Sequence, residues 1–176
     1  MKTKLAILVM LGLLMPVIPA RAATAAAPQP MAALQPLVGC WAGQGWMQRS
    51  PQERHTFTSR ECVRAVLGGT ALAIEGEHRA TEGEGRIVHQ ALGVIRYLSA
   101  ESRYQFHAWL ANGREGDYRG ELTAPGVFVW HMPAQGRAPE IRYTIRFDET
   151  SWEETGEMRT PDGQWRPFFQ MQLTRQ

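Results

Sequence analysis

The two cysteines of the chain, Cys40 and Cys62, are the residues whose type and spacing first suggest chemistry. If the first hairpin turns about Pro51, antiparallel pairing sets Cys40 opposite Cys62, and two cysteines so placed are close enough to bridge. We therefore predict a disulfide rather than two free thiols. It would close a loop of 23 residues and stabilise the fold by about 3 kcal/mol. A redox-active role is not indicated, because no Cys-x-x-Cys motif is present.

The same register places Trp41 opposite Glu61. With the disulfide on the outer surface, strand alternation turns Glu61 inward together with Phe57 and Val63. A buried carboxylate needs a charged or hydrogen-bonding partner. We therefore expect further polar side chains on the inner surface.

Two later hairpins offer such partners. Pairing about Glu82 or Gly83 with an even sum of residue numbers sets His89 opposite Glu75 or Glu77, whereas a slip of one residue removes that pair. A turn at residues 161–163 sets Glu154 across from Gln170. The sequence thus predicts a sparse polar lining of a mainly apolar interior, formed by Glu61, Glu75, His89, Tyr143, Glu154 and Gln170, with Trp41 as a further candidate ligand contact.

Several established kinds of site are not indicated. The five histidines are scattered without metal-binding spacing, so no metal is predicted: His55, His78, His89, His107 and His131. No nucleophile elbow, phosphate loop or dinucleotide fingerprint occurs, and we predict no catalytic residue. In the acidic run 152–157, alternation places Glu153 and Glu157 on one face and Glu154 on the other, so paired acid and base carboxylates are not favoured there.

The elements that must position these residues are strands, because the dominant period from residue 39 onward is two and turn residues recur every ten to fifteen positions. Ten antiparallel strands joined by short turns favour closure into an up-and-down barrel over a two-sheet sandwich. Such a barrel commonly encloses a ligand cavity. The predicted strands are 39–49, 54–66, 70–80, 86–98, 103–111, 117–123, 127–132, 141–147, 152–159 and 165–175.

The N-terminal segment predicts export. Two lysines, an apolar run too short for a membrane span and the sequence Ala20-Arg21-Ala22 are typical of a signal peptide over residues 1–22, cleaved after Ala22. Residues 23–36 are interpreted as an Ala/Pro-rich tether with a short helical turn, and residues 37–176 as one all-β domain. Cleavage changes the formal charge from +2 to −1, which favours neither nucleic acid nor an anionic membrane as partner. No stable membrane anchor is expected after cleavage.

The order Gly39-x-Trp41 after a short turn resembles the opening of lipocalins, and the extended Gly39-x-Trp41-x-Gly43-x-Gly45 resembles nitrobindin and secreted bacterial lipocalin-like proteins. Further similarity lies at 67–69, 72–76, 89–92, 152–157 and 168–175. The resemblance implies a calycin-type barrel in which Gly39 and Trp41 are structural and Arg175 packs over Trp41. Nitrobindin holds haem through a histidine near its C-terminus, whereas this chain has none after His131.

Together these features predict a periplasmic or secreted protein, monomeric or weakly dimeric, that binds a small apolar molecule without a cofactor. Six tryptophans in one domain suit a ring-shaped or apolar ligand. Three alternatives stay open. They are a cyclase or isomerase using His89 and an inner glutamate such as Glu75, a haem or nitric-oxide barrel similar to nitrobindin, and a protein-binding barrel with an exposed apolar patch.

Overall fold

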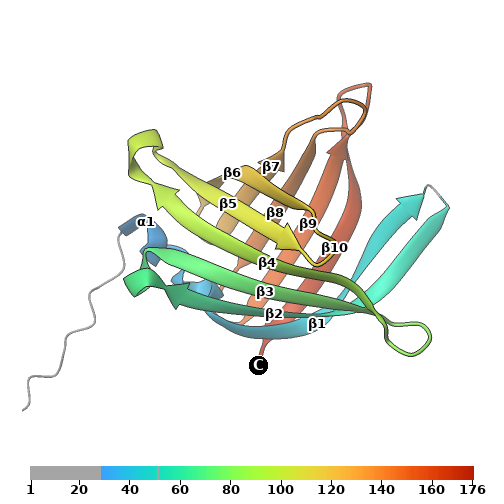
Figure 1. Cartoon of the computed structure of the whole chain (residues 1–176), viewed down its shortest axis with the longest axis horizontal. Helices are drawn as coiled ribbons and strands as arrows, with labels where there is room; N and C mark the ends of the chain where they lie inside the picture. The colour runs from blue at the N-terminus through green and yellow to red at the C-terminus, as the bar shows by residue number, and fades with distance from the viewer. Residues whose placement is uncertain (1–28, 51) are drawn as a thin grey trace, which may run out of the picture.

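The computed structural model describes residues 29–50 and 52–176 and has the form of a single antiparallel barrel (Figure 1). Its elements, in chain order, are α1 (Gln29–Ala32), η1 (Gln35–Leu37), β1 (Gly39–Ser50), β2 (Glu53–Val66), η2 (Leu67–Gly69), β3 (Ala71–Ala80), β4 (Ile87–Leu98), η3 (Ser99–Glu101), β5 (Arg103–Leu110), β6 (Glu115–Ala124), β7 (Val127–Met132), β8 (Ile141–Phe147), β9 (Ser151–Arg159) and β10 (Trp165–Arg175).

Each strand pairs with the next along the chain, and β10 pairs back with β1 to close the barrel. The predicted up-and-down barrel of ten strands is therefore confirmed. Among the described residues, no helix is long and apolar enough to cross a membrane.

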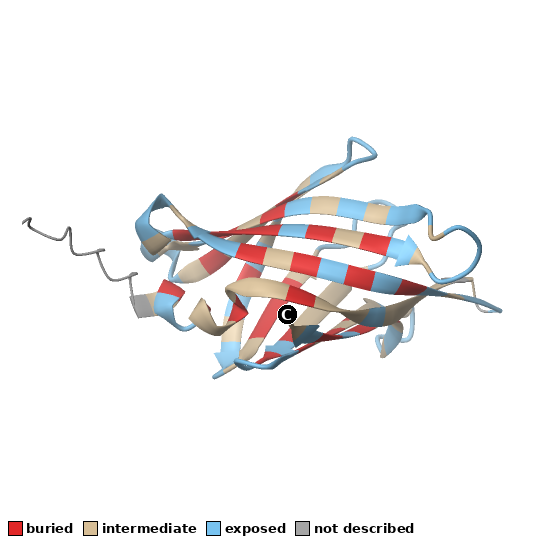
Figure 2. Cartoon of the chain, turned by 90° about the horizontal axis from the view of Figure 1, so that it is seen from below, coloured by how far each residue is buried: buried red, intermediate tan, exposed pale blue. Residues whose placement is uncertain are grey.

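Strand alternation decides which side chains face inward. In β8, Ile145 and Phe147 are buried while Arg146 between them is exposed. Buried and exposed bands alternate in the same way along the other strands (Figure 2). The sequence pattern of period two thus corresponds to one apolar inner face and one wet outer face.

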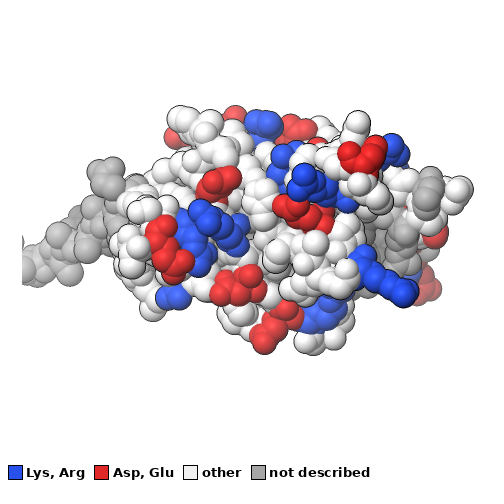
Figure 3. All heavy atoms as spheres, turned by 90° about the horizontal axis from the view of Figure 1, so that it is seen from above, with Lys and Arg blue, Asp and Glu red and all other residues white. Residues whose placement is uncertain are grey.

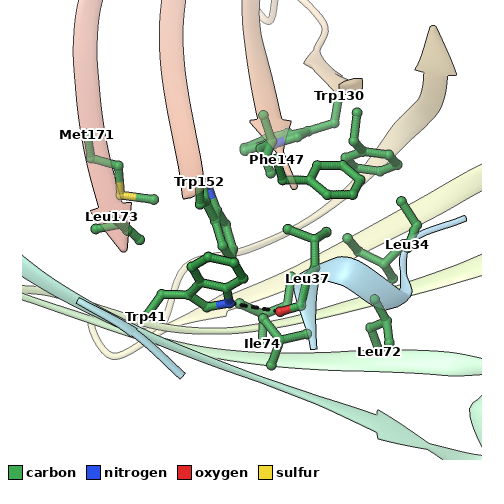
Figure 4. Packing of buried hydrophobic residues seen from close by; sticks show 14 of the residues in the cluster. Leu34, Leu37, Trp41, Leu72, Ile74, Trp130, Phe147, Trp152, Met171 and Leu173 are labelled. Carbon is green, nitrogen blue, oxygen red and sulfur yellow. Dashed lines mark hydrogen bonds between the residues drawn. The ribbon is translucent and has the colours of Figure 1, made fainter. Parts of the chain in front are cut away.

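One end of the barrel, here named the floor, is closed by the chain that precedes β1. Trp41 is fully buried, and its indole Nε1 donates a hydrogen bond of 2.8 Å to the carbonyl oxygen of Leu37 in η1 (Figure 4). Trp152 meets the Trp41 ring edge-on at a centroid distance of 6.0 Å. Met31 and Leu34 are also buried, so the segment interpreted as a tether contributes to the core from α1 onward. The predicted signal peptide and residues 23–28 lie outside the described residues.

Arg175 packs against the floor and stabilises it. Its guanidinium lies 4.2 Å from the Trp41 ring centroid, as the resemblance implied. It also donates hydrogen bonds to the carbonyl oxygens of Pro36, Val38 and Glu149. Gly39 has a φ of +139°, and a Cβ there would lie 2.2 Å from an Arg175 nitrogen. Glycine is therefore required where β1 begins.

The predicted disulfide is present. Cys40 and Cys62 face each other across β1 and β2 with their Cα atoms 4.1 Å apart, and Trp41 pairs with Glu61 in the predicted register. The bridge lies on the outer surface, which leaves Glu61 on the inner one.

Breaking the disulfide should lower the free energy of unfolding by about 3 kcal/mol, because the unfolded chain regains the entropy of an open loop. The measurement is denaturant unfolding of the oxidised protein, the reduced protein and the Cys40→Ser, Cys62→Ser double variant. A double variant that unfolds at the oxidised protein's midpoint would contradict this expectation.

Replacing Arg175 by Met should destabilise the fold by about 3 kcal/mol, because three carbonyls lose a charged donor and the cation–π contact with Trp41 is lost. The matched control is Arg119→Met on the exposed outer face of β6, where a change within about 0.5 kcal/mol is expected. Equal unfolding midpoints for the two variants would refute a special role for Arg175.

Candidate functional site

Four buried polar residues stand out from the apolar core: Ser59, Glu61, His78 and Glu154. Each occupies an inward position of its strand, in phase with apolar neighbours. In β3, for example, Leu72, Ile74 and His78 are all buried, whereas Glu75 is exposed. The four residues form a polar cluster above the floor.

Glu61 and His78 make the central contact of the cluster. The Nε2 atom of His78 lies 3.1 Å from Oε1 of Glu61, and Ser59 Oγ donates to the same oxygen at 3.2 Å. Gly76 makes this possible, because a Cβ there would lie 2.4 Å from the Glu61 carboxylate. If Nε2 carries the proton that bonds Glu61, Nδ1 of a neutral His78 is an acceptor. That buried Nδ1 has no hydrogen-bond partner.

Glu154 is the second buried carboxyl group. Trp152 donates its indole N–H to Glu154 Oε2 at 3.3 Å. Burial first, and then the negative charge of Glu61, raise the pKa of Glu154 to about 8. Glu154 is therefore mostly a neutral carboxylic acid at pH 7, able to donate as well as accept a hydrogen bond.

Rings line the inner wall around the cluster and form what we name the aromatic belt: His89, His78, Phe57, Phe169, Tyr143, Trp130, Phe106 and Tyr118. Two of its contacts are closely stacked. The ring centroids of Phe57 and His78 are 4.4 Å apart, and those of Trp130 and Tyr143 are 4.3 Å apart. The belt takes rings from every strand except β1 and β9.

Burial differs between the two ends of the barrel. Near the floor, the inward side chains of Leu72, Ile95 and Phe128 are at most 1% exposed. Further along the strands, the inward side chains of His89, Phe106 and Tyr143 are only partly buried. Because these side chains point toward the barrel axis, their accessible surface faces the end opposite the floor. Side chains fill the lower part of the barrel, so we name the inner wall at the opposite end the cup; a ligand cavity there stays a prediction.

Burial keeps two titratable side chains of the cup, His89 and Tyr143, uncharged at pH 7. Burial, and then the neighbouring His78, lower the pKa of His89 to about 4, so His89 is neutral at pH 7. Burial raises the pKa of the Tyr143 phenol above its ordinary value, and the nearby Glu154 adds to this effect. The indole Nε1 of Trp130 is buried without a hydrogen-bond partner. Together with His78 Nδ1, two buried polar atoms of the inner wall therefore lack a hydrogen-bond partner.

Two hollows among the described residues are lined by neither Glu61, His78 nor Glu154. One of about 260 Å³ lies where β1, β2 and β10 meet and is lined by residues that include Trp46, Thr56 and Gln170. The other, of about 500 Å³, lies beside η1 and the β6–β7 turn, next to Pro36 and Phe147. Within the described residues, no group of three or more histidine, cysteine or acidic side chains could hold a metal ion.

Four of the predicted lining residues face inward as expected: Trp41, Glu61, Tyr143 and Glu154. Trp41 is nevertheless sealed in the floor rather than exposed to the cup. His89 also faces inward, but it pairs with His78 and not with a glutamate.

Two predicted placements are wrong. Glu75 lies on the outer surface, where it forms an ion pair with Arg64. Gln170 also faces outward, accepting a hydrogen bond from Trp46 and donating one to Glu153. It pairs with Thr155, whereas Glu154 pairs with Met171.

The same local feature explains both errors. Next to the β3–β4 turn, Arg79 pairs with Ile87 in the expected even-sum register. A bulge between His78 and Arg79 then shifts the pairs further from the turn by one residue. In the last hairpin, Pro167 pairs with Glu157 as expected, and a bulge between Pro167 and Phe169 shifts the rest. Proline favours a bulge because it cannot donate to the ladder.

Sequence reasoning missed His78, although a signal for it was present. Leu72 and Ile74 share its parity along β3, so alternation alone places His78 inside and Glu75 outside. Phe169, Met171 and Leu173 assign Gln170 to the outside by the same rule.

The fold is a closed antiparallel barrel whose inner wall carries the polar cluster and the aromatic belt. Comparison with protein-family models and with curated proteins gives no match. Among solved structures, the chain is similar to Rv2717c from M. tuberculosis, with a TM-score of 0.63, 16% identity, and coverage of 86% of this chain and 99% of that one. It is also similar to the S-type phycobiliprotein lyase CPES from Guillardia theta, with a TM-score of 0.55, 11% identity, and coverage of 81% and 89%. At these identities the likeness extends to the fold alone.

The raised pKa of Glu154 predicts a pH dependence of stability. In the unfolded chain this carboxyl ionises near pH 4.5, and in the folded protein near pH 8. Its stabilising contribution is therefore complete below about pH 4.5 and is lost as the pH rises to about 8. Relative to Glu154→Gln, the wild-type free energy of unfolding should fall by roughly 1 kcal/mol per pH unit across that window.

Denaturant unfolding at several pH values measures this difference. The control variant Glu121→Gln, at an exposed outer position of β6, should keep the wild-type profile. Parallel profiles for wild type and Glu154→Gln would show that this carboxyl ionises normally.

Proposed function

We propose that the protein is exported and that its cup binds a small, largely apolar, ring-containing molecule. The observation that carries this proposal is the pair of buried, unpartnered polar atoms, His78 Nδ1 and Trp130 Nε1, within an aromatic lining. Buried polar atoms without partners are unfavourable, so their presence in a cup favours a ligand that completes them. The disulfide on the outer surface supports an oxidising compartment, and the predicted signal peptide supports export.

The aromatic belt supports a flat or ring-shaped ligand. The half-buried faces of Phe106, Tyr118 and Tyr143 provide apolar area that a ligand would cover. The polar cluster below them would orient one end of that ligand. A calycin relationship, which the first residues of β1 suggested, is consistent with this arrangement.

On the surface displayed in Figure 3, acidic and basic side chains are interspersed. Nucleic-acid binding depends on concentrated positive charge, so this face gives no support to a nucleic-acid partner. A monomer or weak dimer stays our expectation for the assembly.

Haem fits the cup poorly. Among the side chains that face inward from the described strands is Glu61, whose carboxylate would repel haem propionates. The last strand also has no histidine. We therefore expect haemin to give no histidine-dependent Soret band.

Catalysis is a second candidate with a specific observation in its favour. The pair first considered, His89 with Glu75, is not available because Glu75 lies outside. Inside, a protonated Glu154 and an unpartnered His78 Nδ1 offer an acid and a base in one cluster. Such a site could isomerise a bound ligand, and turnover of that ligand would distinguish it from a binding site.

A protein-docking barrel is the third candidate. Leu92 and Trp109 pair on the outer surface of β4 and β5, where they are 40% and 41% exposed. Neighbouring residues of β4 face the apolar patch and the cup, so one substitution at each position can distinguish the two sites.

Ala91 faces into the cup, and Leu92 next to it faces outward. Ala91→Trp should weaken binding of the uncharged fluorescent probe N-phenyl-1-naphthylamine at least tenfold, because the new indole occupies the ligand's space. Leu92→Trp should leave binding within about twofold. Fluorescence titration measures both affinities, and thermal unfolding verifies that both variants fold. Weaker binding by Leu92→Trp alone would assign the probe to the outer patch and overturn the proposal.

A further inference from the structure

The hollow of about 260 Å³ is a groove on the outer wall, where β1 lies between β2 and β10. Its base is the strand backbone at Gly45 and at its two partners, Phe57 and Met171, whose side chains are buried on the inner side. The groove thus crosses three strands. Its walls are two rows of residues, Thr81, Thr56, Trp46 and Gln170 on one side and Gln44 and Gln172 on the other.

The groove is open to solvent. The two glutamines of one wall, Gln44 and Gln172, are exposed, and so are the two threonines of the other. Trp46 and Gln170 are half-buried. None of the described residues that line the groove carries a charge. A ligand therefore has direct access and must be held through uncharged groups.

The indole of Trp46 is held in place before any ligand arrives. Its Nε1 donates a hydrogen bond of 3.2 Å to Oε1 of Gln170, and the Gln170 amide donates in turn to Glu153. The guanidinium of Arg54 lies over the ring, 3.7 Å from its centroid, and Arg54 is not among the residues that line the groove. Trp46 thus offers a fixed aromatic surface to a flat, apolar ring face.

The opposite wall offers free amides. Within the described part of the chain, the side chains of Gln44 and Gln172 form no hydrogen bond, whereas the hydroxyls of Thr56 and Thr81 bond each other. Each amide has two N–H donors and one acceptor oxygen. Ligand groups that both donate and accept, as hydroxyls do, match this wall.

These features exclude two classes of ligand. An ionic ligand would lose water without gaining an opposite charge from the lining. A wholly apolar ligand would cover the amides without replacing their bonds to water. A ring with C–H groups on its faces and hydroxyls around its rim satisfies both the indole and the amides. Sugars in the pyranose form have this structure.

We infer that the groove binds the uncharged pyranose ring of a saccharide, stacked on Trp46 with its hydroxyls bonded to Gln44 and Gln172. The β-gluco configuration fits best, because its substituents are all equatorial and both ring faces present only C–H groups. This site lies on the outer wall and is independent of the function proposed for the cup.

Three methyl β-glycosides that share one ring test the inference: the glucoside, the anionic glucuronide and the cationic glucosaminide. The measurement is the ¹H–¹⁵N spectrum of the full protein at pH 6 during titration with each glycoside. The glucoside should shift the Trp46 indole and the side-chain amides of Gln44 and Gln172, with a dissociation constant on the order of 1 mM. The Trp130 indole signal should hold, and both charged glycosides should bind at least threefold more weakly.

The chain offers a matched control for the tryptophan. Trp165 also lies half-buried on β10 under an arginine, with the guanidinium of Arg142 4.4 Å from its ring centroid, but it does not line the groove. Trp46→Leu should weaken glucoside binding at least tenfold, and Trp165→Leu should leave it within about twofold. Thermal unfolding verifies that both variants fold.

The amides are tested at exposed positions, where substitution leaves folding intact. Gln44→Ala and Gln172→Ala should each weaken glucoside binding about threefold or more, because each removes hydrogen bonds to the sugar. The matched control is Gln90→Ala on the exposed outer face of β4, which should retain wild-type affinity.

Longer sugars identify the source of the ring. Equal affinities for cellobiose and cellotetraose assign the groove to a short free sugar, and at least tenfold tighter binding of cellotetraose assigns it to a polysaccharide. Both results support the saccharide site. Tighter binding of the glucuronide than of the glucoside, equal losses in Trp46→Leu and Trp165→Leu, or no glucoside-dependent shift of Trp46 would overturn it. Binding of N-phenyl-1-naphthylamine reports separately on the cup, so either proposal can fail while the other stands.

Discussion

Closure of the sheet depends on β1, which pairs with β2 on one side and β10 on the other. From Trp41 opposite Arg175 to Met47 opposite Phe169, the β1–β10 ladder is continuous. Two glycines of β1 permit it, because a Cβ at Gly43 or Gly45 would lie 2.0 or 2.4 Å from a β10 carbonyl oxygen. The interleaved glycines and tryptophans that begin the strand thus have separate roles: the glycines allow close approach of the last strand, and Trp41 fills the floor.

Once the barrel is closed, side-chain size determines where space is left. Inner glycines stand against large neighbours, as Gly93 does against Phe106 and Gly156 against Tyr143. This alternation of small and large residues packs rings along the wall while the floor is filled from the N-terminal turn. The Glu61 carboxylate has room because Gly76, its partner across the strands, carries no side chain. The position of the site is therefore a consequence of packing as much as of chemistry.

Sequence reasoning succeeded where pairing is uninterrupted. Between Gln48 and Gly39 the first hairpin keeps one register, so the disulfide and the inward Glu61 followed from the position of one turn. It failed at Glu75 and Gln170, where bulges shift the register between the turn and the site. A bulge depends on local backbone geometry that residue types only partly encode, although Pro167 marks one of them. Reading parity from apolar neighbours along the same strand is independent of bulges in the partner pairing, and it would have placed both residues correctly.

The central claim is that the apolar ligand occupies the cup rather than the surface hollows, and the tryptophans are placed to test it. Trp130 lines the cup, Trp41 is bonded within the floor, and Trp46 borders the hollow between β1, β2 and β10. The measurement is the ¹H–¹⁵N spectrum of the six indole groups during titration with N-phenyl-1-naphthylamine. Our account predicts that the Trp130 signal moves most while the Trp41 and Trp46 signals hold. Movement of Trp46 with Trp130 unchanged would contradict it.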